Sequence, residues 1–188
     1  MLPKDQVALR GLHSIEDLLA AMAAAGGDVP PGVMAAVGRG FAGVPHRIGP
    51  VRTLNGVHWY NDSIATSPTR VIAGLRAFDQ KLIVIAGGYD KNIPFEPMAK
   101  DVVERVKLLI LMGPTAPKID AAVRAAPGFA QSGLRIVHAK SLEDAVRIAR
   151  EEAKSGDIVT LSHACASFDA YPNFEARGNH FKELVNAL

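Results

Sequence analysis

The sequence predicts an α/β protein: a doubly wound, mostly parallel, Rossmann-like sheet with a β-hairpin at its start, preceded by a short helical segment. Three observations support this fold class. Short apolar runs recur along the chain, amphipathic stretches of helical period separate them, and an Asn55-Gly56 pair joins two β-rich arms. Continuous apolar strands that alternate with helices are typical of a parallel sheet covered on both faces.

The helical segment is expected over residues 1–44. "HSIEDLLAAMAAAGG" places apolar side chains on one face, with Ser14 as the expected N-cap and Gly26-Gly27 as the end. "PPGVMAAVGRGFAG" predicts a second, shorter helix. Gly38–Gly43 matches G-x-G-x-x-G, but the dinucleotide fingerprint requires a strand before it and a helix beginning on it. We therefore interpret these glycines as a linker.

The α/β domain is expected over residues 45–188. It opens with the hairpin "VRTL-NG-VHWY", because Asn55-Gly56 suits the positive φ angles of a type I′ turn. The later strands are expected at Leu82–Ala86, Leu108–Met112, Leu134–Val137 and Ile158–Leu161. The helices between them are expected at Ser67–Phe78, Pro94–Val106, Ala116–Ala126 and Ser141–Ala153, and the chain ends in helix-like sequence.

The composition is that of an ordinary globular protein. Of the 188 residues, 48% are hydrophobic and 21% are charged. The 21 Lys and Arg are scattered among 19 Asp and Glu without a basic stripe, so nucleic acid is not an expected partner. A single cysteine fits a reducing compartment, and no apolar run approaches a signal peptide or a membrane span. We expect a cytoplasmic protein that does not bind membranes.

Four loops fall where the predicted sheet would place a ligand, beyond the carboxyl ends of its strands. They are "NDSIATSP", "GGYDKN", "GPTAP" and "SHACASFDAYPNFEARG". Lys91 could bind a carboxylate or phosphate, or be a solvated lysine in a turn. The amide and hydroxyl groups of residues 61–66 could bind an anion or cap the following helix.

Two other kinds of chemistry are not favoured by the sequence. His163 and Cys165 have no evident orienting partner, so a buried structural cysteine is favoured over a nucleophile. The histidines are too dispersed to suggest a metal site, and none is expected. No G-x-x-x-x-G-K-[ST] phosphate loop occurs in the sequence.

Five segments, taken in order, resemble the Mur ligases: "HSIEDLLAA", "FAGVPHR", "NGVHWYNDSIATSP", "IAGGYDKNIPF" and "LSHACASFDAYPNFEARGNHF". They are most similar to the branch of the family that adds D-glutamate. The resemblance covers essentially the whole chain but only the last part of a ligase. It implies that residues 1–44 are a helical remnant of the central ATP-binding domain and that residues 45–188 are the C-terminal, D-glutamate-receiving domain.

The resemblance also implies an activity. Such ligases add D-glutamate to UDP-N-acetylmuramoyl-L-alanine through an acyl phosphate, in the synthesis of peptidoglycan precursors. ATP and Mg²⁺ would be held mainly by the N-terminal and central domains, which would be partners missing from this chain. The chain alone is therefore expected to be inactive.

Five residues match positions that bind D-glutamate in the family. Thr66 and Lys91 would bind one carboxylate. Ser167 and the backbone around Phe168 and Phe174 would bind the other. A cation, hydroxyl groups and backbone N–H donors suit a dicarboxylate.

Three residues match positions that contact ATP in the family: Arg47 for the phosphates, Asp62 for the nucleotide and Asp17 near the adenine. Asp17 stands where relatives have asparagine, so its side chain can accept a hydrogen bond from the adenine amino group but cannot donate one. Ile64 replaces a lysine found in many relatives, and His163 replaces a proline.

Two other interpretations remain open on the sequence. The chain could be a non-catalytic binding module that kept the fold. It could also belong to a related ATP-dependent ligase such as a folylpolyglutamate synthase, although the motif "ACASFD…NFEARG" favours the D-glutamate branch.

Overall fold

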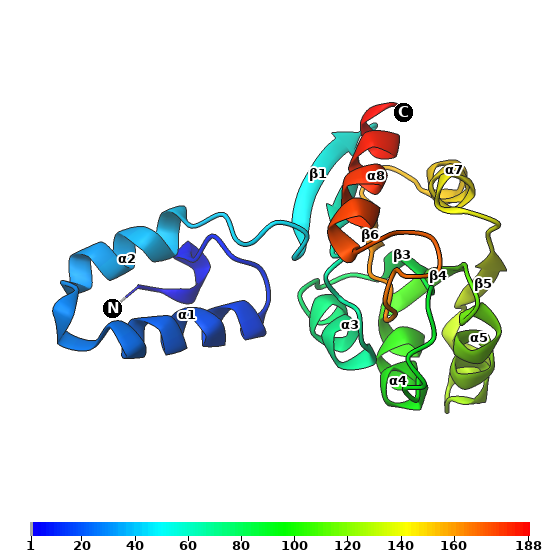
Figure 1. The fold of residues 1–188 in the computed structure, drawn as a ribbon, viewed down its shortest axis with the longest axis horizontal. Helices are drawn as coiled ribbons and strands as arrows, with labels where there is room; N and C mark the ends of the chain where they lie inside the picture. The colour runs from blue at the N-terminus through cyan, green and yellow to red at the C-terminus, as the bar shows by residue number, and fades with distance from the viewer. Residues whose placement is uncertain (1) are drawn as a thin grey trace. The chain divides into compact units, whose positions relative to one another are not determined.

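A computed structural model describes residues 2–188 of the chain (Figure 1). The chain divides into two compact units, the first ending at Pro45 and the second running from His46 to Leu188. None of the helices in the described residues is long and apolar enough to cross a membrane.

The first unit is built on two helices, α1 (Leu12–Ala25) and α2 (Pro31–Gly40). Short 3-10 turns, η1 (Lys4–Gln6) and η2 (Gly26–Asp28), precede α1 and follow it. The expected N-cap at Ser14 is wrong, because Gly11 caps the helix and Ser14 is buried within the first turn. Gly11 has a φ of 87°, which lets the chain enter the helix earlier than the serine signal indicates.

The second unit contains one six-stranded sheet in the order β1-β2-β6-β3-β4-β5. Its strands are β1 (Gly49–Leu54), β2 (Val57–Asn61), β3 (Leu82–Ala86), β4 (Val106–Leu111), β5 (Arg135–His138) and β6 (Ile158–Leu161). Only β1 runs antiparallel to its neighbour. Asn55 and Gly56 have φ angles of 51° and 78°, as a type I′ turn requires. The predicted fold class is confirmed.

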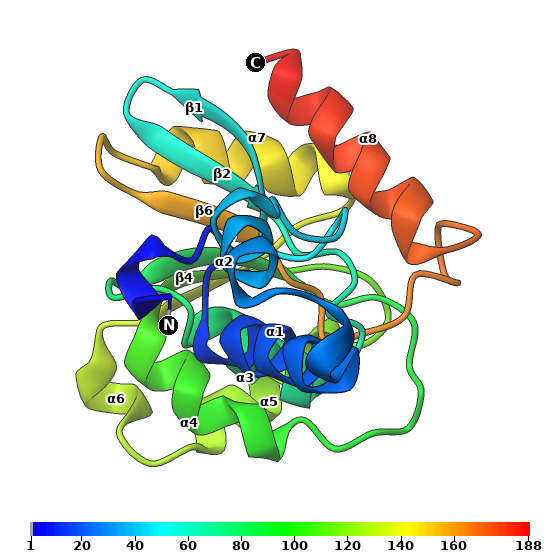
Figure 2. The ribbon, with the colours of Figure 1, turned by 90° about the vertical axis from the view of Figure 1, so that its left-hand side faces the viewer.

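Helices cover both faces of this sheet (Figures 1 and 2). One face carries α3 (Pro68–Leu75), α4 (Glu96–Arg105) and α5 (Ala116–Ala125). The other carries α7 (Leu142–Glu152) and α8 (Phe174–Asn186). The four-residue helix α6 (Phe129–Ser132) was not predicted.

Successive residues of β3 pack alternately into two separate hydrophobic cores. Leu82, Val84 and Ala86 pack with the first group of helices, and Ile83 and Ile85 pack with the second. Side chains alternate across a strand, so a strand buried on both faces is apolar at every position. This requirement explains why "LIVIA" was recognisable from the sequence with its correct limits.

The strand order determines where loops meet. Strands β2, β6 and β3 are neighbours and parallel, so their carboxyl ends lie along one edge of the sheet. Three of the four loops identified in the sequence follow these three strands, and the fourth, at residues 113–117, follows β4. The fold therefore brings together segments that lie about a hundred residues apart in the chain.

The turn after β3 tolerates only glycine at its first position. Gly87 has a φ of 106°, and a Cβ there would lie 2.0 Å from the carbonyl oxygen of Met112. Gly133 also has a positive φ, of 71°, but a Cβ there would meet no atom within 4 Å. Alanine at position 133 would therefore introduce backbone strain alone, whereas alanine at position 87 would add a steric clash with Met112.

Gly87→Ala should therefore cost much more stability than Gly133→Ala. We expect Gly133→Ala to lower the free energy of unfolding by about 1 kcal/mol, and Gly87→Ala to lower it by roughly 3 kcal/mol or more. Urea unfolding followed by circular dichroism would measure both. Equal losses would show that Met112 does not confine the turn.

Candidate functional site

The five residues expected to bind D-glutamate lie on loops that meet at the edge formed by β2, β6 and β3. Thr66 lies just before α3, Lys91 follows β3, Ser167 and Phe168 follow β6, and Phe174 begins α8. Lys91 and Phe168 are exposed, Thr66 and Phe174 are half-buried, and Ser167 is buried. The structure thus places the segments of the predicted set side by side, although the role of each residue stays a prediction.

Arg177 connects these loops, and the sequence analysis did not identify it. Its side chain is 1% exposed. Nε donates to Ser63 Oγ (3.0 Å) and Nη2 donates to the Ser63 carbonyl (2.8 Å). Nη1 donates to the carbonyls of Cys165 (3.2 Å) and Ala166 (3.1 Å). One guanidinium from α8 therefore holds the loop after β2 against the loop after β6.

Ser63 and Asn61 extend this network. Ser63 Oγ donates to the Phe174 carbonyl (2.8 Å), and the Ser63 N–H donates to Asn61 Oδ1 (3.0 Å). Asn61 Nδ2 donates to the Gly178 carbonyl and to His46 Nδ1, both at 3.0 Å. The sequence left open whether the polar groups of this loop bind an anion or serve the fold. The side chains of Asn61 and Ser63 serve the fold.

Glycines allow the loop after β3 to pack closely against the loop after β6. The Gly87 N–H donates to the His163 carbonyl (2.9 Å), and the Tyr89 N–H donates to the Ala166 carbonyl (3.1 Å). A Cβ on Gly88 would lie 2.6 Å from the Ala166 carbonyl oxygen, so this contact requires glycine. The same turn carries Lys91 two residues beyond Tyr89.

His163 and Cys165 are structural in this arrangement. Burial raises the pKa of the Cys165 thiol to about 11, so it is a thiol and not a thiolate at neutral pH. Cys165 lies 3.1 Å from the Thr115 hydroxyl. Burial and then Arg177 lower the pKa of His163 well below its ordinary value, and its Nδ1–H donates to the Gly87 carbonyl. The sequence interpretation, which favoured a buried structural cysteine, agrees with this geometry.

Asp62, expected to contact the nucleotide, is almost enclosed, with 4% exposed. Its Oδ1 accepts the Ile48 N–H (3.3 Å) and its Oδ2 accepts the Ser162 hydroxyl (2.9 Å). Burial raises the pKa of Asp62 to about 7, against the opposing effect of these hydrogen bonds and of two nearby arginines. In this conformation the carboxylate joins the start of β1 to the end of β6, and a nucleotide would need another arrangement to reach it.

The other two residues expected to contact ATP are Arg47 and Asp17. Arg47 is half-buried and precedes β1, and Asp17 is exposed on α1 in the first unit. Their nucleotide contacts stay predictions. Within residues 2–188, no group of three or more His, Cys, Asp or Glu side chains is placed to bind a metal ion.

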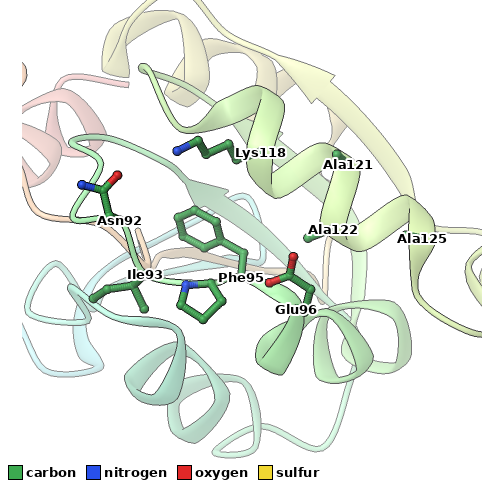
Figure 3. Close-up of a pocket in the computed structure, with 9 residues that line it drawn as sticks. Asn92, Ile93, Phe95, Glu96, Lys118, Ala121, Ala122 and Ala125 are labelled. Carbon is green, nitrogen blue, oxygen red and sulfur yellow. The ribbon is translucent and has the colours of Figure 1, made fainter.

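A groove of about 610 Å³ lies beside the loop after β3, between that loop and α5 (Figure 3). Figure 3 shows Lys118 of α5 pointing toward the loop near Asn92, and Lys118 forms an ion pair with Asp90. The lining residues are Asn92, Ile93, Pro94, Phe95, Glu96, Lys118, Ala121, Ala122 and Ala125. None of the five residues expected to bind D-glutamate lines the groove. It is therefore distinct from the predicted carboxylate site.

Comparison with known proteins confirms the resemblance to Mur ligases. The family described as "Mur ligase, glutamate ligase domain" matches residues 46–165. The UDP-N-acetylmuramoylalanine--D-glutamate ligase of Clostridium beijerinckii is 55% identical over 185 residues, which cover 98% of this chain and 40% of that ligase. The chain thus spans about two fifths of the length of the curated relatives it matches.

Solved structures show the same fold at low identity. A pseudomurein peptide ligase type C from Methanothermus fervidus matches with a TM-score of 0.69 and 16% identity, over 94% of this chain and 36% of that one. A folylpolyglutamate synthase from Mycobacterium tuberculosis, complexed with ADP, gives 0.63 and 14%, over 94% and 41%. At these identities the likeness establishes the fold alone.

The buried Asp62 should make stability depend on pH. Because its pKa is raised from 3.8 to about 7 in the folded protein, its contribution is complete below pH 4 and is lost as the pH rises through 7. Asp62→Asn removes this titration, so the variant should gain stability relative to wild type by roughly 2 kcal/mol or more between pH 4 and pH 8.

Urea unfolding across that pH range would measure the difference. Asp79→Asn, a substitution of an exposed acid in the same unit, is the matched control and should show no such trend. A constant difference between Asp62→Asn and wild type would mean that the Asp62 carboxyl does not titrate in this window.

Proposed function

We propose that this chain, which belongs to the Mur ligase family, is the acceptor-binding part of an ATP-dependent ligase that adds D-glutamate to UDP-N-acetylmuramoyl-L-alanine. The observation that carries the proposal is the meeting of three loops at one sheet edge, in a chain that matches D-glutamate ligases over nearly its whole length. These loops contain the cation, hydroxyl groups and backbone donors that a dicarboxylate requires.

In the proposed complex, each end of D-glutamate has its own set of donors. Lys91 and Thr66 bind one carboxylate, and the charge-assisted contact with Lys91 supplies the strongest anchor. Ser167 and the backbone of Phe168 and Phe174 bind the other. The first N–H groups of a helix have no partner within it. Asn173 caps α8 by accepting the Ala176 N–H (2.7 Å), and the Phe174 N–H at the helix start can serve the ligand.

Binding both carboxylates orients the amine of D-glutamate for attack. ATP supplies the phosphoryl group that activates the carboxylate of UDP-N-acetylmuramoyl-L-alanine. The role of this chain is to present the acceptor amine in one orientation, which reduces the entropic barrier to amide formation. Arg47 is the accessible candidate for a phosphate contact, whereas the enclosed carboxylate of Asp62 fits a nucleotide poorly in this conformation.

The remaining components are proposed to lie in the rest of the full-length protein. Residues 1–44 would be the end of a central ATP-binding domain, and the phosphate loop, the Mg²⁺ ligands and the site for UDP-N-acetylmuramoyl-L-alanine would come from segments outside this chain. Such an enzyme would work in the cytoplasm, in peptidoglycan precursor synthesis. Because the other components are required for phosphoryl transfer, the 188-residue chain should give no ligation product by itself.

Selective binding of D-glutamate is the direct test. In an NMR titration, D-glutamate should shift the amide resonances of Thr66, Lys91 and residues 167–174, and L-glutamate should not. Lys91→Gln should weaken binding by about tenfold or more, because it removes a hydrogen bond between two charged groups. Lys100→Gln, at an exposed lysine of α4, is the matched control and should bind as wild type does.

The same titration separates the proposed function from its alternatives. Equal binding of D- and L-glutamate, or L-selectivity, would favour a related ligase such as a folylpolyglutamate synthase. Full-length protein that binds D-glutamate but forms no product with ATP would favour a non-catalytic module.

A further inference from the structure

Arg177 carries a buried positive charge that has no acidic partner. Among the described residues, no Asp or Glu oxygen lies within ion-pair distance of its guanidinium, and its contacts are the Ser63 hydroxyl and three backbone carbonyls. Burial lowers the pKa of Arg177 to about 10, so the group remains protonated at neutral pH. Asp169 opposes this effect electrostatically from beyond ion-pair distance, so the buried charge is only partly balanced and is costly to keep.

The carbonyls that Arg177 binds belong to the loop expected to receive a carboxylate. The Ala166 carbonyl accepts from Arg177 Nη1 and also from the Tyr89 N–H, so the peptide group that joins Ala166 to Ser167 is fixed from two sides. Among the described residues, 2–188, the backbone has no cis peptide bonds. In a trans peptide the C=O and N–H groups point in opposite directions. The Ser167 N–H therefore points away from Arg177.

The next peptide is fixed in the same way. The Ser167 carbonyl accepts the N–H groups of Ala170 (3.0 Å) and Tyr171 (2.8 Å), which directs the Phe168 N–H to the opposite side. Within residues 2–188, neither the Ser167 N–H nor the Phe168 N–H has a hydrogen-bond acceptor. Two consecutive donors are thus oriented and unpaired, and the carbonyl of the first peptide is polarised by a cation.

We infer that Arg177 is a positioning residue for the acceptor: it does not touch the ligand, but it orients and polarises the Ser167 N–H, which binds one carboxylate together with the neighbouring Phe168 N–H, and that carboxylate adds to the balance of the buried charge. The inference rests on the proposed function for the identity of the ligand. The carboxylate site itself follows from the peptide geometry. One ammonium group cannot span Ser63 and two carbonyls on another loop, so a lysine at this position would keep only part of the arrangement.

Acetate is the probe that isolates this site, because it presents one carboxylate without the rest of D-glutamate. The ¹⁵N and ¹H resonances of Ser167 and Phe168 would be followed in a titration with sodium acetate, against sodium chloride at the same ionic strength. We expect saturable shifts in the wild type, affinity about tenfold or more weaker in Arg177→Met, and an intermediate loss in Arg177→Lys.

Val185→Ala is the control for stability, since Val185 lies in the core on the same helix and eight residues beyond Arg177. It should lower stability yet keep the affinity for acetate within about twofold of wild type, because truncating a core side chain there leaves both loops in place. If Arg177→Met does not fold, the comparison of Arg177→Lys with Val185→Ala decides the matter.

The outcomes separate the inference from the proposed function. Acetate shifts that depend on Arg177, together with no preference for D-glutamate, would overturn the proposed ligand and support the positioning role. Absence of acetate shifts at Ser167 and Phe168 in the wild type would overturn the positioning role, as would a folded Arg177→Met or Arg177→Lys variant that binds acetate as tightly as wild type.

Discussion

A single buried guanidinium organises the candidate site. Arg177 occupies the space between the loop after β2 and the loop after β6, and the second of these loops in turn binds the backbone of the loop after β3. Each loop is irregular and could take many conformations alone. Their mutual hydrogen bonds select one, and the sheet beneath them supplies the rigid base. The site is thus defined largely by backbone groups held in place by these hydrogen bonds.

The sheet could be predicted because its strands and turns accept only certain residue types. Strands buried on both faces are mostly apolar, which made Leu82–Ala86 and Ile158–Leu161, with Thr160 its only polar residue, recognisable with correct limits. The turn at Asn55-Gly56 needs two positive φ angles, which few residue pairs tolerate. The meeting of the polar loops at one edge could also be predicted, because the carboxyl ends of neighbouring parallel strands lie together.

The network within the site could not be predicted, because its partners are mostly backbone atoms. Arg177 binds carbonyl groups, which every residue possesses, so no pairing pattern marks it in the sequence. For Asp62 the sequence suggested a ligand contact, because it is a polar residue in a polar loop. In the structure its carboxylate is buried and accepts hydrogen bonds from the Ile48 N–H and the Ser162 hydroxyl. Whether a polar side chain is available to a ligand or is buried within the fold depends on the tertiary structure, which the local sequence does not reveal.

The order of the strands has a consequence for synthesis of the protein. Ser63 and Arg177 are 114 residues apart, and β2 lies next to β6, so the ribosome makes one side of the site long before the other. At about 5–20 residues per second, the β1–β2 hairpin exists for about 6–23 seconds before Arg177 is added. A two-stranded hairpin is marginally stable in water, and its unpaired edge can associate with other chains. The nascent chain therefore leaves the edge of β2 unpaired until β6 has been made, and the site can form only once α8 has left the ribosome.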